Sequence, residues 1–307
     1  MKRNFGTRQR DPMRAASVLL NASRDAGGTS FSTVATVLQR FEKFVGFARE
    51  RGVSRLDKVT RLLVQNYALF LRDSDYSPAY QQNLLSAVNT VLARGYESQS
   101  QRWQPVTSRA EGLTRRDNVR KSPTTSKEQL LQAQADMPEH AAIVADLARE
   151  LGLRSKEAAL LNARAALKEA KEKLLVTIVD GTKGGRTRNV PVTQPSQVDA
   201  LIKAARLQGD NRSLIPSHQT WVEFRATTLY NGRAALKRAG IAGYHALRAA
   251  YAADRYLEVT GSLAPCNTNC RRTAERAIDL HAREIIAEEL GHGRTDVLVS
   301  YVGSRKS

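Results

Sequence analysis

The first third of the chain passes from a polar opening to segments that each carry one apolar face. Residues 1–29 are mostly polar and end in Gly27-Gly28, which predicts an N-terminal arm or an irregular first helix. Over 30–97 apolar residues recur at helical spacing, with caps expected at Asp57 and at Ser77. This pattern predicts a small all-helical domain.

The helical pattern stops over residues 98–123, which hold few apolar residues and two prolines. Such a composition predicts an interdomain linker. Its basic side chains could follow a phosphate backbone, and a solvated tether is the alternative. The linker residues predicted to bind DNA are Arg115, Arg116, Arg120 and Lys121.

The remainder of the chain, 124–307, combines helices with one hairpin. The β-rich run 174–179, a glycine-rich turn and the run 188–192 predict two antiparallel strands. A capping-box pattern from Thr125 to Glu128 opens this domain. The fold class predicted is therefore mainly α with a small β-hairpin. Further helices are expected at 139–151, 196–207, 219–239, 245–260, 272–290 and 294–302.

Both parts of the chain are basic. Lys and Arg number 48 against 30 Asp and Glu, a formal net charge of +18. Residues 1–120 contribute +10 of this and residues 121–307 contribute +8. A polyanion that touches both parts is the simplest partner, and DNA or RNA fits best. A basic protein kept soluble by its charge is the alternative.

Other features narrow the class of protein. The hydrophobic content of 41% allows a folded core, and no apolar run approaches the length of a membrane span. No apolar segment follows the basic N-terminus, so we expect a cytoplasmic protein without a secretory signal. The two cysteines, Cys266 and Cys270, are too few for a disulfide scaffold and weak evidence for zinc. We expect no metal site and no cofactor.

Four segments of the second domain could carry chemistry together. They are Gly152-Leu153-Arg154 with Glu157 three residues later, a hairpin turn with Lys183 before two glycines, His245-Ala246-Leu247-Arg248, and Leu290-Gly291-His292 nine residues before Tyr301. Taken singly, each residue suits an ordinary surface, cap or packing position. Their types, order and local contexts together favour a shared site.

In this order the segments resemble the tyrosine recombinase (phage integrase) family. The resemblance covers residues 123–303, and 30–97 also resembles, less specifically, the SAM-like core-binding domain of that family. It implies a two-domain clamp, in which a core-binding domain joins a catalytic domain through the linker.

The resemblance implies roles for six catalytic residues and one support. Arg154 and Arg248 would hold the non-bridging oxygens of the scissile phosphate, and Lys183 would protonate the leaving 5′-hydroxyl. His245 would assist proton transfer to and from the nucleophile Tyr301.

The remaining implied roles concern the surroundings of the phosphate. His292 would donate to a phosphate oxygen, and Glu157 would orient the site. Arg186 and Arg188 share the hairpin with Lys183; both are predicted to bind DNA, and either could replace Lys183 as the turn cation.

General chemistry agrees with this residue set. A guanidinium group binds phosphate oxygens in bidentate fashion and places fixed positive charge where a transition state gains negative charge. A tyrosine with an ordinary pKa near 10 needs a base or nearby cations to attack at neutral pH. One departure from the family pattern is the length of the segment 249–289, about twice what we expect.

The function expected is a site-specific DNA recombinase, an integrase of a phage or mobile element, that needs neither metal nor ATP. Its partner would be double-stranded DNA, with a homotetramer on two duplexes, a monomer in free solution and DNA-bending accessory proteins. Alternatives with the same chemistry are a resolvase, an inversion enzyme or a type IB topoisomerase-like enzyme. A non-catalytic DNA-binding protein is a further alternative, and a metal-dependent nuclease is disfavoured.

Overall fold

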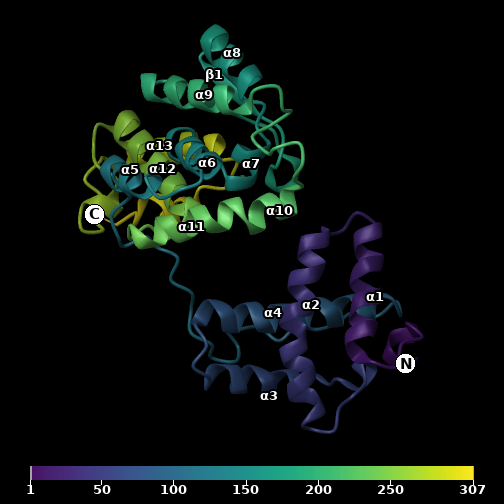
Figure 1. The fold of residues 1–307 in the computed structure, drawn as a ribbon. Coiled ribbons are helices and arrows are strands. Elements are labelled where there is room, and N and C mark those ends of the chain that lie inside the picture. The colour runs from purple at the N-terminus through teal and green to yellow at the C-terminus, as the bar shows by residue number, and fades with distance from the viewer. Residues whose placement is uncertain (1, 307) are drawn as a thin grey trace. The chain divides into compact units, whose positions relative to one another are not determined.

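The chain folds into two units, each with its own hydrophobic core. The computed structural model describes residues 2–306, and the units are Met1–Asp117 and Asn118–Ser307 (Figure 1). Among the described residues, no helix combines the length and the apolar character needed to cross a membrane. The fold is mainly helical with one two-stranded sheet, as the sequence predicts.

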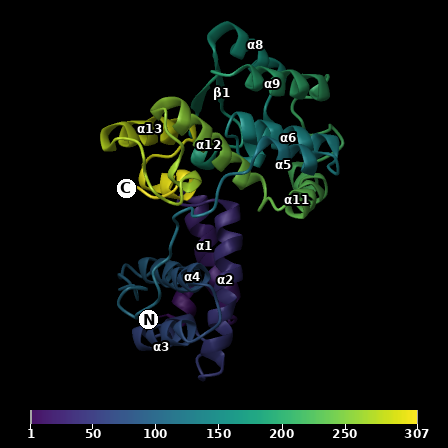
Figure 2. The same ribbon diagram turned by 90° about the vertical axis from the view of Figure 1, so that its left-hand side faces the viewer.

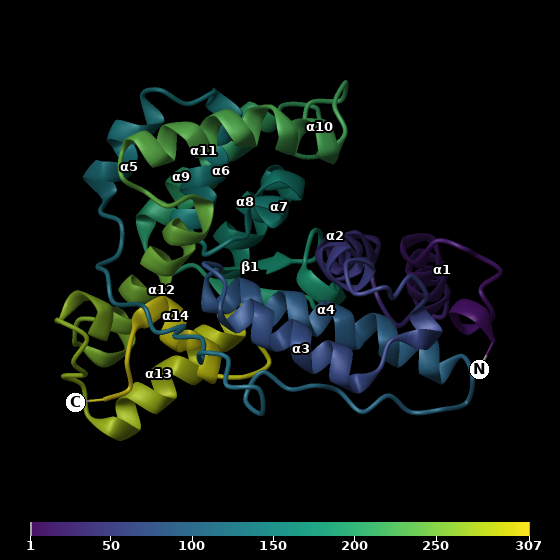
Figure 3. The ribbon, with the colours of Figure 1, turned by 90° about the horizontal axis from the view of Figure 1, so that it is seen from below.

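Four helices and two short 3-10 turns form the first unit. Hydroxyl or carboxylate side chains cap every helix start, as at Ser30 and Ser77, whose oxygens accept backbone N–H groups of the first turn. Helix α1 lies beside α2 (Figure 2), and α3 lies beside α4 (Figure 3). The elements are η1 (Arg3–Gly6), α1 (Pro12–Asp25), α2 (Phe31–Arg49), η2 (Leu56–Lys58), α3 (Arg61–Arg72) and α4 (Pro78–Glu97).

The segment predicted as an arm or an irregular first helix contains a regular, packed helix. In α1 the side chains of Ala15, Ala16 and Leu20 are buried in the core of the first unit. The helix has a clear start, because Asp11 caps it and Pro12 occupies the first helical position. The prediction overlooked this start because polar residues outnumber the apolar ones that form the buried stripe.

The cap expected at Asp57 was also misplaced. Asp57 lies in η2, where its carboxylate pairs with Arg55 and accepts the backbone N–H of Asn4 at 2.6 Å. Thr60 caps α3 instead, through its hydroxyl.

Most of the predicted linker packs against the first unit. Trp103, Val106 and Leu113 are buried there, and the indole Nε1–H of Trp103 donates to Oδ1 of Asn89 at 2.9 Å. The boundary between the units falls after residue 117. A few apolar anchors therefore fix a segment whose overall composition resembles that of a free tether.

The second unit contains the sheet and the remaining helices. Helix α12 lies between α6 and α13 (Figure 2), whereas α8 and α9 lie together beside β1 (Figure 1). The elements up to the hairpin are α5 (Lys127–Gln134), α6 (Glu139–Glu150), α7 (Ser155–Leu160), α8 (Ala163–Lys173), β1 (Leu175–Ile178), η3 (Lys183–Gly185) and β2 (Arg188–Pro191). Those after it are α9 (Pro195–Gln208), α10 (Trp221–Ala226), α11 (Thr228–Arg238), α12 (Tyr244–Thr260), η4 (Pro265–Asn267), α13 (Arg276–Glu289), η5 (Asp296–Leu298) and α14 (Val299–Val302).

The predicted hairpin is present, with β1 antiparallel to β2 and Val176 opposite Val190. Two local predictions need correction. The capping box belongs to Ser126 and Gln129, one residue later than expected. The single helix expected over 219–239 is interrupted at Thr227, which separates α10 from α11.

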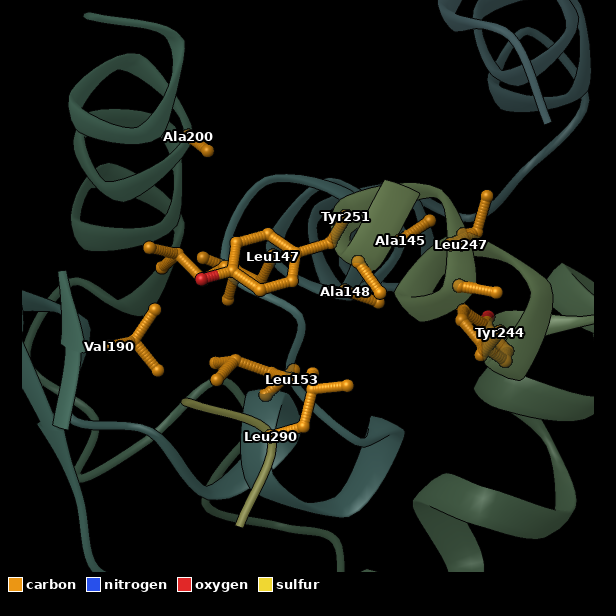
Figure 4. Close-up of a cluster of buried hydrophobic side chains, with 14 of the residues drawn as sticks. Ala145, Leu147, Ala148, Leu153, Val190, Ala200, Tyr244, Leu247, Tyr251 and Leu290 are labelled. Carbon is orange, nitrogen blue, oxygen red and sulfur yellow. The ribbon is translucent and has the colours of Figure 1, made fainter. Parts of the chain in front are cut away.

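The core of the second unit fixes the backbone beside each chemistry-bearing segment. Leu153, Leu247 and Leu290 are fully buried, and each belongs to one of those segments (Figure 4). Val190 in β2 anchors the hairpin in the same core. Packing at these apolar positions therefore brings together segments that are far apart in the chain.

The long segment 249–289 completes α12, passes through η4 and forms α13. Cys266 is buried and Cys270 is half-buried, and both are free thiols. In α13 the buried Arg283 pairs with Asp279 at 2.9 Å and donates to the carbonyl of Ser304 at 3.0 Å. Arg283, in this longer segment, therefore fixes the position of the chain that follows α14.

Candidate active site

One open cavity of about 780 Å³ in the second unit gathers residues from four predicted segments. The charged side chains that line the cavity are lysine and arginine. Glycines from the hairpin and from the turn after α13 also line it. The lining residues are Arg154, Lys183, Gly184, Arg186, His245, Gly291, His292, Gly293, Arg294, Val297 and Tyr301. A polyanion can enter such a cavity, because it is wide and its charged walls are basic.

A sharp turn between α6 and α7 positions Arg154. Gly152 adopts a positive φ of 61°, and a Cβ there would lie 2.5 Å from the Tyr251 ring. Only glycine fits this close approach. Beyond the turn, the Glu157 carboxylate accepts the backbone N–H of Arg154 at 2.7 Å and its guanidinium Nη1 at 2.6 Å. The side chain of Arg154 is therefore held at the cavity wall.

The Glu157 carboxylate is shared by three guanidinium groups. Its side chain is fully buried, and the shortest nitrogen–oxygen distances are 2.6 Å to Arg154, 2.7 Å to Arg188 and 3.8 Å to Arg248. Burial alone would raise the pKa of Glu157, but hydrogen bonds and charge from Arg188, with a smaller effect of Arg154, lower it to about 2. One negative charge thus faces three positive charges, which leaves the cluster cationic.

Arg248 lies behind the cavity. Its guanidinium group donates to the backbone carbonyls of Gly152 and Leu290, and its Nε is buried without a hydrogen-bond partner. Burial lowers the pKa of Arg248 to about 10, so the group stays protonated at neutral pH. The Tyr301 ring covers it, with the guanidinium carbon 5.9 Å from the ring centroid.

Tyr301 lies between the two predicted histidines. Its Oη is 3.1 Å from Nε2 of His292, and the His245 ring centroid is 5.1 Å from that of Tyr301 in an edge-on arrangement. Tyr301 is largely buried yet reaches the cavity. His292, rather than His245, is within hydrogen-bond distance of the hydroxyl.

Both histidines are neutral at pH 7. Burial, followed by the charges of Arg248 and Arg154, lowers the pKa of His292 to about 4. His245 is exposed on the cavity, and partial loss of solvent around its ring, followed by the charges of Arg248 and Arg154, lowers its pKa as well. A neutral imidazole can accept a proton from a neighbouring hydroxyl.

The hairpin brings Lys183 to the cavity. Gly184 and Gly185 both have positive φ, which forms the tight η3 turn, and Lys183 is exposed at its tip. The neighbouring Arg186 is exposed on the same wall, as a DNA-binding residue would be.

The structure places Arg188 in a position that does not favour the predicted contact with DNA. Its guanidinium group is buried, donates to both carboxylate oxygens of Glu157 and gives its Nε–H to the carbonyl of Glu289 at 2.7 Å. Alternation along β2 points it inward, whereas Asn189 is exposed. Arg188 is therefore not available as the turn cation either.

The four predicted DNA-binding residues of the linker lie outside the cavity. Arg116 is half-buried against α4, where it donates to the Ala79 carbonyl and to Asn83, so it is a poor candidate for DNA contact. The Arg120 side chain donates to the carbonyls of Ser122 and Pro123. Arg115 and Lys121 are exposed.

Sequence reasoning missed Arg294, which lies on the cavity wall and pairs with Asp296 at 3.1 Å. Its position in the sequence, two residues after His292, could have indicated that it lies near the site. Two other tyrosines of α12, Tyr251 and Tyr256, are poorly suited to attack. The hydroxyls of Tyr251 and Tyr256 are buried and donate to Glu289 and Asp279, and burial raises the pKa of both.

The low pKa of Glu157 predicts an acid-sensitive second unit. The folded-state pKa of about 2 lies below the ordinary 4.5, so this carboxylate stabilises the fold above pH 4.5. The contribution, about 3 kcal/mol, is lost as pH falls from 4.5 towards 2. We expect the difference in unfolding free energy between wild type and Glu157→Gln to shrink by this amount across that range.

Chemical denaturation at a series of pH values measures this difference. Glu172→Gln is the control, because Glu172 is exposed on α8 and lies 3.9 Å from its lysine partner. A pH-independent difference for Glu157→Gln would contradict the prediction.

Comparisons with known proteins identify an integrase family model and solved structures with the same fold. An integrase family model matches residues 111–254. The Tn1549 transposon integrase in complex with transposon right end DNA is 12% identical, with a TM-score of 0.59 over 94% of this chain and 95% of that chain. A lambda integrase tetramer bound to a Holliday junction is 15% identical, with a TM-score of 0.56 over 95% and 76% of the two chains.

A third solved structure, the XerH site-specific recombinase bound to palindromic difH substrate, is 16% identical, with a TM-score of 0.57 over 93% of this chain and 80% of that chain. No curated protein sequence matches the chain. The integrase family model matches just under half of the chain, and the chain shares its fold with these site-specific recombinases, so it resembles the tyrosine recombinase family.

Proposed function

We propose that this enzyme cuts and rejoins double-stranded DNA through a covalent 3′-phosphotyrosyl link to Tyr301. The observation that carries the proposal is the place of the Tyr301 hydroxyl, 3.1 Å from a neutral His292 and beside the cationic cluster on Glu157. A nucleophile, a proton acceptor and fixed positive charge for a phosphate thus lie within one cavity.

The cleavage step balances with groups from this chain. Oη of Tyr301 attacks the phosphorus and forms the P–O bond of the phosphotyrosyl link, while the bond from phosphorus to the 5′ oxygen breaks. The tyrosine proton passes to a neutral histidine. His292 is in hydrogen-bond reach, and His245, to which the family resemblance assigns this role, flanks the ring. The Lys183 ammonium group gives a proton to the leaving 5′ oxygen.

Rejoining reverses these proton movements with a different 5′-hydroxyl. A hydroxyl from the partner duplex attacks the phosphotyrosyl phosphorus and releases Tyr301. The link stores the energy of the broken phosphodiester, so no step consumes ATP and the cationic side chains take the charge-stabilising role of a metal.

Contact between the phosphate and Arg248 requires Tyr301 to move. The tyrosine ring covers the guanidinium group, which has no exposed surface on the cavity. Arg154 is half-exposed on the wall and is available to the phosphate first. Rotation of the Tyr301 ring towards the DNA would then uncover Arg248 behind it.

The partner and the assembly follow from charge and from the fold. The net charge of +18 supports double-stranded DNA as the substrate. The tetramer of lambda integrase on a Holliday junction supports a homotetramer on two duplexes, formed from monomers on the DNA. We further propose an integrase of a phage or mobile element that acts in the cytoplasm at the nucleoid, with DNA-bending accessory proteins.

Covalent trapping tests this function. The protein is incubated in EDTA, without nucleotide, with a plasmid carrying the DNA that flanks its own gene. Nicked duplexes from any cleaved site then serve as suicide substrates. We expect a protein–DNA adduct that survives SDS, because loss of the nicked strand prevents rejoining.

Two outcomes would contradict the proposal. Specific DNA binding to a nicked site with no adduct would indicate a protein that uses the fold for binding alone. An adduct that forms only after a divalent metal is added would contradict the metal-independent chemistry.

A further inference from the structure

The buried side chain of Arg188 joins three segments of the active site. Arg188 starts β2, so it belongs to the hairpin that carries Lys183. Its Nη1 and Nη2 donate to the two oxygens of Glu157 at 2.8 and 2.7 Å, and its Nε donates to the carbonyl of Glu289 at 2.7 Å. The hairpin, α7 and the end of α13 therefore meet at one guanidinium group.

Each partner of Arg188 is connected to a residue that lines the cavity, either by hydrogen bonds or by closeness in the sequence. Glu157 holds both the backbone N–H and the guanidinium group of Arg154. Glu289 ends α13, three residues before His292. The turn between Glu289 and His292 lies close to Arg188. A Cβ added to Gly291 in this turn would be 3.0 Å from the Cδ of Arg188.

The geometry assigns Arg188 the part of a positioning residue for DNA cleavage: it holds Arg154 and His292 in register with the Lys183 hairpin and does not itself contact DNA. This inference rests on the proposed function. A lysine at this position could not replace it fully, because one ammonium group does not span two carboxylate oxygens and a carbonyl with fixed geometry.

The first test separates DNA affinity from the rate of cleavage. We expect Arg188→Met to leave the dissociation constant for a nicked substrate within about threefold of wild type, because the side chain is buried. Its single-turnover rate of adduct formation should fall about 100-fold, since displacement of catalytic groups by about 1 Å has an effect of that size. Arg188→Lys should recover part of the rate, because it keeps the charge beside Glu157.

Two control variants make the result specific. Arg149→Met removes another buried arginine of the second unit, which pairs with Asp254 at 2.6 Å and does not line the cavity. It should leave the cleavage rate near that of wild type. Arg186→Ala, two residues from Arg188 but exposed on the cavity wall, should weaken DNA binding.

A second measurement needs no DNA. The backbone N–H of His292 donates to the Ala287 carbonyl at 2.7 Å, so its hydrogen exchange reports how firmly the end of α13 is held. Loss of a charged hydrogen bond from Arg188 to Glu289 should speed this exchange by about tenfold or more. Arg149→Met should not change it.

Several outcomes would overturn the inference. They are an unchanged rate and unchanged exchange in Arg188→Met, a loss of DNA affinity as large as that of Arg186→Ala, and an equal loss of rate in Arg149→Met. If wild type forms no adduct at all, the proposed function fails, while the exchange measurement still decides whether Arg188 holds the turn.

Discussion

Replacement of Tyr301 by phenylalanine is expected to abolish the SDS-stable DNA adduct while DNA binding persists. The change removes one oxygen, and the ring can still pack against His245, His292 and Arg248. Without Oη no phosphotyrosyl bond can form, so the loss should reach the detection limit. Gel shift on a nicked substrate measures binding, and SDS gel electrophoresis measures the adduct.

Tyr256→Phe is the matched control for the nucleophile. Its hydroxyl donates to Asp279 at 2.8 Å within the core, so the variant should form the adduct as wild type does. An adduct that survives in Tyr301→Phe would contradict the assignment of the nucleophile. Tyr251 is a poor substitute, because its buried hydroxyl donates to Glu289.

Replacement of Lys183 by alanine should slow cleavage by about 100- to 10,000-fold, the range typical of a lost general acid. A substrate with sulfur in place of the 5′ bridging oxygen should restore most of the rate. A thiol has a pKa of about 8.5, so a thiolate leaves without a proton. Single-turnover adduct formation on the two substrates measures the effect.

Exposure of Lys183 at the tip of η3 makes this a clean test, because the variant should fold normally. Lys168→Ala, at an exposed position on α8, is the control and should cleave both substrates at the wild-type rate. An equal defect of Lys183→Ala on the oxygen and sulfur substrates would show that the lysine acts on binding rather than on the leaving group.

Most residues that line the candidate site could be located from the sequence, because they stand in short local motifs. Arg154, His245, Arg248, His292 and Tyr301 each follow or precede an apolar anchor, and these anchors form one core. Helical and strand periodicity identified most of the surrounding elements. The break at Thr227 escaped detection, because no proline or glycine marks that position.

Side-chain partners were harder to predict than segments. Arg186 and Arg188 look alike in a basic turn, yet Arg186 is exposed in the turn before β2, whereas Arg188 at the start of β2 is buried against Glu157. The segment over 98–117 had a linker composition, but Trp103 and Val106 fix it to the first unit. Such outcomes depend on contacts between distant parts of the chain, which local composition does not reveal.

The sharing of one carboxylate by three arginines limits how this chain can diverge. A neutral residue at position 157 would leave neighbouring buried guanidinium groups without an anion, and loss of Arg188 would leave the carboxylate with fewer cations. Breaking a buried ion pair from one side costs about 3–5 kcal/mol, a large part of the stability of a domain. A related protein that no longer cleaves DNA would therefore have to replace the arginines and the glutamate together. Otherwise it would retain the whole cluster for stability alone.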